Sequence, residues 1–141
     1  MMKKAISKPR TRDPVDRQAA FQRGVDAEDV AARWLEALGF VEIDRRARMK
    51  GGELDLIMED AETLIFVEVK ARAKLSAGAE SLSARQQARI RTGLRAWLAI
   101  HDPSGERAAT RSIRCDVVLV APGVDPVHIP NAFPAAQDDG F

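Results

Sequence analysis

The sequence predicts an α/β protein in which a mixed central sheet is flanked by helices, with its core elements in the order α-β-β-β-α-β. Two observations support this prediction. Apolar residues recur at helical spacing in residues 16–38 and 83–100, and the segments between and after them contain short runs rich in β-branched and aromatic residues. Helices on both sides of a sheet would bury the apolar residues of each layer. The length of 141 residues indicates one domain.

The first helix is expected over residues 16–38, after a disordered basic tail of residues 1–15. Lys, Arg, Pro and Ser dominate the tail, which has few apolar residues. Asp16 can cap the helix and Gly39 follows its end. Ala27, Ala31 and Trp34 share one face of the helix, which we expect to pack on the sheet.

Three strands are expected next. Residues 40–43 begin a short strand that leads into a basic run, and residues 53–59 and 64–70 form two further strands joined by a polar turn. The third of these strands is apolar on both faces at its start, which favours a central place in the sheet.

The second half of the chain is expected to complete the domain at residue 134. A loop over residues 71–82 leads to a helix that Ser83 caps and that ends near residue 100. Residues 114–120 form a strand, residues 127–129 a short fifth strand, and residues 135–141 a tail. Cys115 and Trp97 are expected in the core, and Asp116 in an ion pair with a nearby arginine.

Composition restricts the location and the class of the protein. The single cysteine rules out a disulfide within the chain and favours a reducing compartment, so we expect the cytoplasm. The basic N-terminal residues precede no apolar run of a signal peptide, and no stretch approaches the length of a membrane span. The net charge of +1 is uninformative, but basic residues cluster in the tail, before the hairpin and on the second helix.

The hairpin of residues 53–70 carries charged residues where a buried strand pair is expected. If Ala61 and Glu62 form a two-residue turn, Asp55 lies opposite Glu68, with Cβ atoms about 5 Å apart. Two carboxylates at that separation repel by roughly 3 kcal/mol at an effective dielectric constant near 20. A bound Mg²⁺ or Mn²⁺ would turn this repulsion into attraction, with the carbonyl of Val69 as a further ligand. Lys70, on the same side as Glu68, could then assist a water molecule or a phosphate.

The alternative for the same residues is an exposed hairpin face held by ordinary ion pairs. Glu68 would pair with Lys70, and Glu53 with an arginine of the neighbouring strand. The spacing of these residues alone does not separate the two interpretations.

Several motifs resemble the YraN-like family of uncharacterised bacterial proteins. They are GELDLI at 52–57, FVEVKAR at 66–72, and matching stretches at 24–31, 34–40, 114–118 and 128–133. That family is similar to the restriction-endonuclease-like superfamily, whose nuclease motif is PD-(D/E)xK and which includes Holliday-junction resolvases. Three departures are that Arg46 stands where the family usually has asparagine, that Arg85 stands where a lysine is common in the second helix, and that Leu54 replaces the proline of the nuclease motif.

The resemblance implies a role for each matching residue. Asp55 and Glu68 match the metal-binding acids, Lys70 the catalytic lysine, and Glu28 an acid of the first helix that helps to bind metal. Supporting roles fall to Glu53 and to a glutamine near the start of the second helix, either Gln86 or Gln87.

The implied function is a Mg²⁺- or Mn²⁺-dependent DNA endonuclease that acts on branched or otherwise structured DNA. The alternative is a nucleic-acid-binding module on a nuclease fold that does not cut. A homodimer is left open, and no membrane association is expected. The candidates for contacts with the DNA backbone are Arg46, Arg48, Lys50, Arg72, Arg85 and Arg89. The arginines of the second helix come in i,i+4 pairs, 85/89 and 91/95, which could follow a phosphate backbone or could equally form a solvated helix surface.

Overall fold

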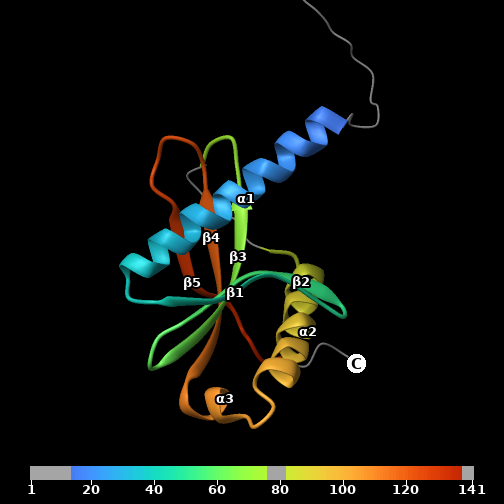
Figure 1. Ribbon diagram of the computed structural model, residues 1–141, viewed down its shortest axis with the longest axis vertical. Coiled ribbons are helices and arrows are strands. Elements are labelled where there is room, and N and C mark those ends of the chain that lie inside the picture. The colour runs from blue at the N-terminus through green and yellow to red at the C-terminus, as the bar shows by residue number, and fades with distance from the viewer. Residues whose placement is uncertain (1–13, 76–81, 138–141) are drawn as a thin grey trace, which may run out of the picture.

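A computed structural model describes residues 14–75 and 82–137, with side chains from Asp26 onward (Figure 1). The elements are α1 (Pro14–Ala37), β1 (Val41–Met49), β2 (Gly52–Glu59), β3 (Thr63–Ala71), α2 (Ala84–His101), α3 (Glu106–Thr110), β4 (Ser112–Val120) and β5 (Val127–Phe133). Of the predicted tails, 1–15 and 135–141, residues 1–13 and 138–141 lie outside the described residues, as does half of the predicted loop over 71–82, namely residues 76–81.

The five strands form one mixed sheet in the order β1-β2-β3-β4-β5. The β3–β4 pair is parallel and the other three pairs are antiparallel. A parallel pair needs a crossover connection, which the segment containing α2 and α3 provides. The predicted α/β class, the element order and the central position of β3 are therefore confirmed.

Each face of the sheet is covered by one long helix. On one face, Ala27, Ala31 and Leu35 of α1 pack in a core cluster with Leu56 of β2 and Val118 of β4. Their i, i+4, i+8 spacing places them on a single side of the helix. On the other face, the core cluster gathers around α2. Its residues include Ile57, Phe66, Leu82, Ile90, Leu94, Trp97, Cys115, Val117 and Phe133.

The β2–β3 hairpin has the predicted register. Its ladder runs from Glu59 opposite Leu64 to Leu56 opposite Val67. The N–H of Asp60 donates to the carbonyl of Thr63 at 2.9 Å and closes the turn. The Asp60 carboxylate in turn accepts the backbone N–H groups of Glu62 and Thr63. This polar capping fixes which residues face each other along the two strands.

The prediction for β1 was wrong in length, because the basic run belongs to the strand. Residues 45–49 pair with β2 beyond an irregularity between Glu42 and Asp44. The charges are accommodated by partners on the strand and on α1. Arg45 forms ion pairs with Glu42 and with Asp29, and Asp44 accepts the indole N–H of Trp97 at 2.9 Å. Strand β5 is likewise longer than predicted and continues to Phe133.

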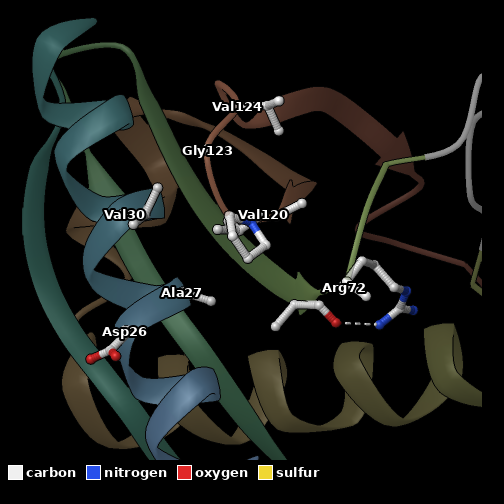
Figure 2. A pocket seen from close by; sticks show the side chains of 11 residues that line it. Asp26, Ala27, Val30, Arg72, Val120, Gly123 and Val124 are labelled. Atoms are coloured by element: carbon white, nitrogen blue, oxygen red, sulfur yellow. Dashed lines mark hydrogen bonds between the residues drawn. The ribbon is translucent and has the colours of Figure 1, made fainter.

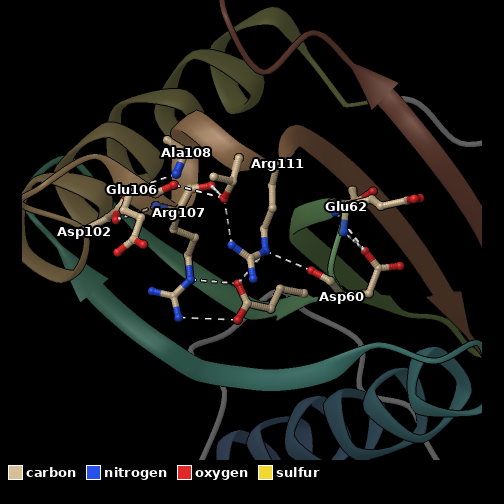
Figure 3. A network of polar contacts seen from close by, with 10 residues as sticks. Asp60, Glu62, Asp102, Glu106, Arg107, Ala108 and Arg111 are labelled. Carbon is tan, nitrogen blue, oxygen red and sulfur yellow. Dashed lines mark hydrogen bonds and ion pairs between the residues drawn. The ribbon is translucent and has the colours of Figure 1, made fainter.

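The short helix α3 was not predicted. A network of ion pairs connects it to the hairpin turn (Figure 3). Arg107 binds the carboxylate of Glu59 at 2.7 Å, and Arg111 contacts Glu59 at 3.3 Å and the carbonyl of Asp60 at 2.8 Å. The network holds the turn of the hairpin at the end opposite to Asp55 and Glu68.

Candidate functional site

The candidate site lies where β2 and β3 separate. Their ladder ends at Leu56 opposite Val67, one step before Asp55 and Glu68. Beyond that point, a side chain of β2 takes the place of its backbone as the partner of β3. The Asp55 carboxylate accepts the backbone N–H of Val69 at 2.9 Å. Strand β3 continues its pairing with β4 up to Ala71. The opening therefore places the Asp55 side chain between the two strands.

Asp55 is a strongly perturbed acid. Burial and, second, the negative charge of Glu68 raise the pKa of Asp55 from 3.8 to about 8. A side-chain hydrogen bond with Glu68 acts in the same direction, whereas the Val69 N–H lowers the pKa. The predicted convergence of these two carboxyl groups is thus present in the structure, with one proton favoured between them.

Lys70 neutralises the second acid. Its ammonium nitrogen lies 3.2 Å from the Glu68 carboxylate, and both side chains are 19% exposed. Both arise from β3 two residues apart, so they project to the same side of the strand. The alternative predicted for an exposed hairpin face also includes this ion pair. The exposure of both side chains is much lower than that alternative requires.

Glu28 reaches the site from α1 but is held by an arginine. Only 9% of the residue is exposed, and its carboxylate accepts a hydrogen bond from Arg46 at 2.6 Å. Burial raises the pKa of Glu28, and Arg46 opposes that rise. Arg46 itself has a positive φ of 49°, a conformation that asparagine adopts more readily than arginine. This conformation gives a structural reason for the asparagine that the YraN-like family usually has at position 46.

Helix α2 forms the other wall of the site. A cavity of about 80 Å³ is lined by Gly52, Glu53, Glu68, Gln86, Arg89 and Ile90. Gln86 also accepts the N–H of Ser83 in a capping box, which holds its side chain at the start of the helix. The structure therefore brings Glu53 and Gln86, the two residues predicted to have supporting roles, to the same cavity as Glu68.

The glycine pair lets the β1–β2 turn contact α2 closely. A Cβ atom on Gly52 would lie 3.0 Å from the carbonyl oxygen of Arg89, and one on Gly51 would lie 2.6 Å from Thr92. Gly51 also has a φ of +94°. The turn therefore packs directly on residues 89–92 of α2.

The predicted DNA-contacting residues differ in their environment. All six are exposed, but Arg46 differs from the other five in that its side chain, 41% exposed, is bound to Glu28. Arg48 lies 3.7 Å from Glu53 with 90% of its side chain exposed, so this contact contributes little. The idea that Arg91 follows a phosphate backbone was wrong. Arg91 is 1% exposed and donates to the carbonyl of Pro134.

The donor atoms of the site suit a hard divalent cation. A buried carboxyl group beside a second one, with its ionisation suppressed, is an environment that a cation relieves. Asp55 and Glu68 supply carboxylate oxygens, and the carbonyl of Val69 lies on the same strand. In the described part of the chain, no three His, Cys, Asp or Glu side chains form a group arranged to hold a metal ion. Glu28 is thus not a third acid of such a group in this structure, and its predicted contribution to metal binding stays a prediction.

A second polar cluster was only partly foreseen. Asp116 is fully buried and forms the predicted ion pair with an arginine, Arg114, at 2.7 Å. It also contacts the His128 ring at 2.8 Å and accepts the N–H of Asn131 at 2.9 Å. Asn131 has a positive φ of 51°, which asparagine tolerates well. The cluster therefore ties β5 to β4, and this role explains the motifs at 114–118 and 128–133.

The fold and the site together define an α/β protein with paired carboxyl groups and a lysine at the opening between two central strands. The chain belongs to the uncharacterised protein family UPF0102, whose model matches residues 27–120. This result confirms the YraN-like resemblance of the sequence motifs.

Curated relatives match over almost their whole length. A UPF0102 protein of Methylorubrum extorquens (strain PA1) is 44% identical over an alignment of 126 residues that covers 86% of this chain and 95% of the relative. A UPF0102 protein of Rhodopseudomonas palustris (strain HaA2) is 43% identical over 121 residues, 86% of this chain and 91% of the relative. One from Bradyrhizobium sp. (strain BTAi1 / ATCC BAA-1182) is 39% identical over 132 residues, 94% of each chain.

Among solved structures, Pyrococcus furiosus SfsA in complex with Ca²⁺ matches at a TM-score of 0.31 and 17% identity. The match covers 79% of this chain and 63% of that chain. Within residues 14–75 and 82–137, no helix is long and apolar enough to cross a membrane.

Proposed function

We propose that this protein is a divalent-metal-dependent DNA endonuclease of the PD-(D/E)xK type, which hydrolyses phosphodiester bonds in branched or otherwise structured DNA. The observation that carries the proposal is the buried Asp55 carboxyl group, set against Glu68 at the end of a strand ladder with Lys70 3.2 Å from Glu68. Like-charged groups are costly in this position unless a cation or a proton accompanies them. Functional sites are where such perturbed groups concentrate.

Each residue of the site has a task in this proposal. Asp55 and Glu68 would hold the Mg²⁺ or Mn²⁺ ion, with the carbonyl of Val69 as a further ligand. When bound, the ion would supply Lewis-acid activation of the phosphate and of the attacking water. Lys70 would stabilise the negative charge that develops on the phosphate, because its ammonium group already lies beside the acid pair.

Supporting roles follow from the walls of the site. Glu53 and Gln86 would shape the cavity that Glu68 faces. The exposed basic residues Arg48, Lys50 and Arg89 would hold the DNA backbone, with Arg72 and Arg85 beside them. Contacts of this kind orient DNA without reading its sequence. The buried, lone Cys115 agrees with a cytoplasmic location for this activity.

A cleavage assay tests the proposal. Purified protein is incubated with linear, flapped and four-way-junction DNA, in Mn²⁺ or in EDTA. We expect cuts in Mn²⁺ only, reduced at least about 100-fold in Asp55→Asn and in Lys70→Ala. The matched controls are Asp125→Asn and Lys74→Ala, which change an acid and a lysine at exposed positions. Equal activity in the parent and in both site variants would show a contaminating nuclease and refute the assignment.

One observation favours a second candidate function, a DNA-binding module that does not cut. Glu28 and Glu68 are already paired with Arg46 and Lys70, an arrangement that needs no metal. This candidate predicts salt-sensitive DNA binding that persists in Lys70→Ala, together with no Mn²⁺-dependent cleavage by the parent protein.

A further inference from the structure

Three charged residues of the site region lie in one row across neighbouring strands. In the β1–β2 register, the residues on either side of Arg46 face the residues on either side of Asp55, so these two residues lie at the same level. The register of the hairpin places Asp55 level with Glu68 in the same way. Neighbouring strands are about 4.8 Å apart, so the backbone of Arg46 is one strand away from that of Asp55. A guanidinium group therefore arises beside the acid pair.

Arg46 covers the buried carboxylate of Glu28 from the solvent side. The side chain of Arg46 is 41% exposed and that of Glu28 is 12% exposed, and 2.6 Å separates the guanidinium nitrogen from the carboxylate oxygen. Because the guanidinium is the exposed partner, rotation of its long side chain can carry it into solvent. The carboxylate would stay behind in the interior, on α1.

Arg46 also begins a basic run that is open to DNA. Arg48 and Lys50 follow it at intervals of two residues, which are about 7 Å along an extended chain. All three residues are exposed. Arg46 differs from Arg48 in its partner, since Arg48 has only a weak contact of 3.7 Å with Glu53. A DNA backbone held by this run would pass within reach of the arginine that covers Glu28.

The charge of Glu28 acts on the acid pair. Burial and, second, the charge of Glu68 raise the pKa of Asp55, and the charge of Glu28 adds to them. This action is electrostatic and needs no direct contact. Two cations oppose it, because Lys70 binds Glu68 and Arg46 binds Glu28. Departure of Arg46 would leave the group one unit more negative, which favours a divalent cation.

A larger cavity on the α1 face of the sheet offers no better place for the ion. It encloses about 770 Å³ between α1, the end of β3 at Ala71, and the end of β4 with the loop that follows it (Figure 2). Val30 and Val124 are among its apolar walls, and Asp26 is the one acid among the described residues that line it. A hard cation takes several oxygen ligands, so one carboxylate beside aliphatic walls suits it poorly.

We propose that Arg46 couples DNA binding to metal binding at the candidate site. A DNA phosphate draws the guanidinium away from Glu28, because phosphate and carboxylate accept the same paired hydrogen bonds from arginine. The released carboxylate adds its charge to that of Asp55 and Glu68, so the cation binds more tightly when DNA is present. By linkage, the cation tightens DNA binding by the same factor. The inference rests on the proposed function, since it concerns the metal and the DNA of that site.

Mn²⁺ titration without DNA, followed by electron paramagnetic resonance of the free ion, tests the metal side. Arg46→Asn should bind Mn²⁺ about tenfold more tightly than the parent, because Glu28 has lost its counter-ion. The matched control Arg48→Asn removes the same charge from a side chain that is 90% exposed and should stay within about twofold of the parent. The gain should disappear when Glu28→Gln is added to Arg46→Asn. A purely structural ion pair predicts the opposite sign, with weaker Mn²⁺ binding in Arg46→Asn.

Fluorescence anisotropy in EDTA, at one fixed salt concentration, tests the DNA side with a flapped duplex. Glu28→Gln should bind this DNA about fivefold more tightly than the parent, because a neutral amide releases the guanidinium to the phosphate. In the Arg46→Asn background, Glu28→Gln should change the affinity by less than about twofold. The matched control Glu36→Gln removes an exposed acid from the same helix and should also stay within about twofold.

Thermal unfolding establishes which variants are folded. Arg46→Gln, which has no charge but can still donate to Glu28, repeats both titrations if Arg46→Asn does not fold. Asparagine suits the φ of 49° at position 46, so we expect Arg46→Asn to fold.

The inference would be overturned by Mn²⁺ binding in Arg46→Asn that is no tighter than in the parent, or by a gain that survives Glu28→Gln. It would also be overturned if Glu28→Gln left DNA affinity unchanged or raised it equally with and without Arg46, or if the parent bound no Mn²⁺ or no DNA. Both couplings as expected, without Mn²⁺-dependent cleavage, would support the role of Arg46 and refute the nuclease. Cleavage that is lost in Asp55→Asn, with no coupling through Arg46, would do the reverse.

Discussion

Replacing Asp55 by asparagine should stabilise the protein in the absence of metal. Asparagine keeps an oxygen that can accept the Val69 N–H, adds donors for Glu68, and removes the ionisable group. The folded-state pKa of Asp55 is raised to about 8, whereas its ordinary value is 3.8. At pH 7, roughly 1.4 kcal/mol for each pH unit above 3.8 gives about 4 kcal/mol as the upper bound on the gain in unfolding free energy of Asp55→Asn over the parent. Because water and side chains rearrange around buried charges, we expect this gain to be about 2 kcal/mol.

The pH dependence has a defined sign. Between pH 3.8 and about 8, the folded protein holds a proton on Asp55 that the unfolded chain releases. The stability that this proton contributes is fully present below pH 3.8 and is lost as the pH rises to about 8. The advantage of Asp55→Asn should therefore be close to zero near pH 4 and largest above pH 8.

Urea unfolding at constant ionic strength, in EDTA and from pH 4 to 9, measures this difference. The control is Asp125→Asn, which removes a carboxylate from an exposed position. The reasoning would be refuted if Asp55→Asn lost several kcal/mol at pH 8, or if its advantage were the same at every pH. Either result would mean that Asp55 is an ionised structural group.

Three further perturbations test other parts of the account. Mn²⁺ at saturating concentration should raise the melting temperature of the parent by about 5 °C at pH 8 and leave Asp55→Asn within about 1 °C, and an equal rise in both proteins would place the ion elsewhere. Asp116→Ala should lower the free energy of unfolding by about 3 kcal/mol, because the fully buried Asp116 carboxylate accepts from Arg114 and from the backbone N–H of Asn131, and both donors lose this acceptor. A loss below about 1 kcal/mol in urea unfolding would contradict that role. Gly52→Ala should cost about 1 kcal/mol through contact with the Arg89 carbonyl, and an unchanged unfolding midpoint would show that the turn can move away from α2.

The sequence predicted the parts of the fold that depend on local patterns. The alternation of β2 and β3, and the polar turn at Asp60, determined the hairpin register and hence which two carboxyl groups meet. The spacing of Ala27, Ala31 and Leu35 determined the buried side of α1. These features follow from period and turn chemistry, which a single sequence carries.

The parts that could not be predicted depend on partners distant in sequence. Arg45 extends β1 because Asp29 on α1 meets its charge, a contact that local propensity does not reveal. Arg91 is buried because Pro134 and the ring of Phe133 receive it, although its spacing suggested a surface residue. The cavity beside Ala71 arises where α1, β3 and the β4–β5 loop meet, so no one segment indicates it.

Crystals soaked in Mn²⁺ provide the most direct measurement, through anomalous diffraction at the manganese absorption edge. The account predicts a peak within about 2.5 Å of carboxylate oxygens of both Asp55 and Glu68, which is absent in Asp55→Asn crystals soaked in the same way. If the parent shows no peak there at saturating Mn²⁺ and the two carboxyl groups lie apart, the metal site does not exist as described.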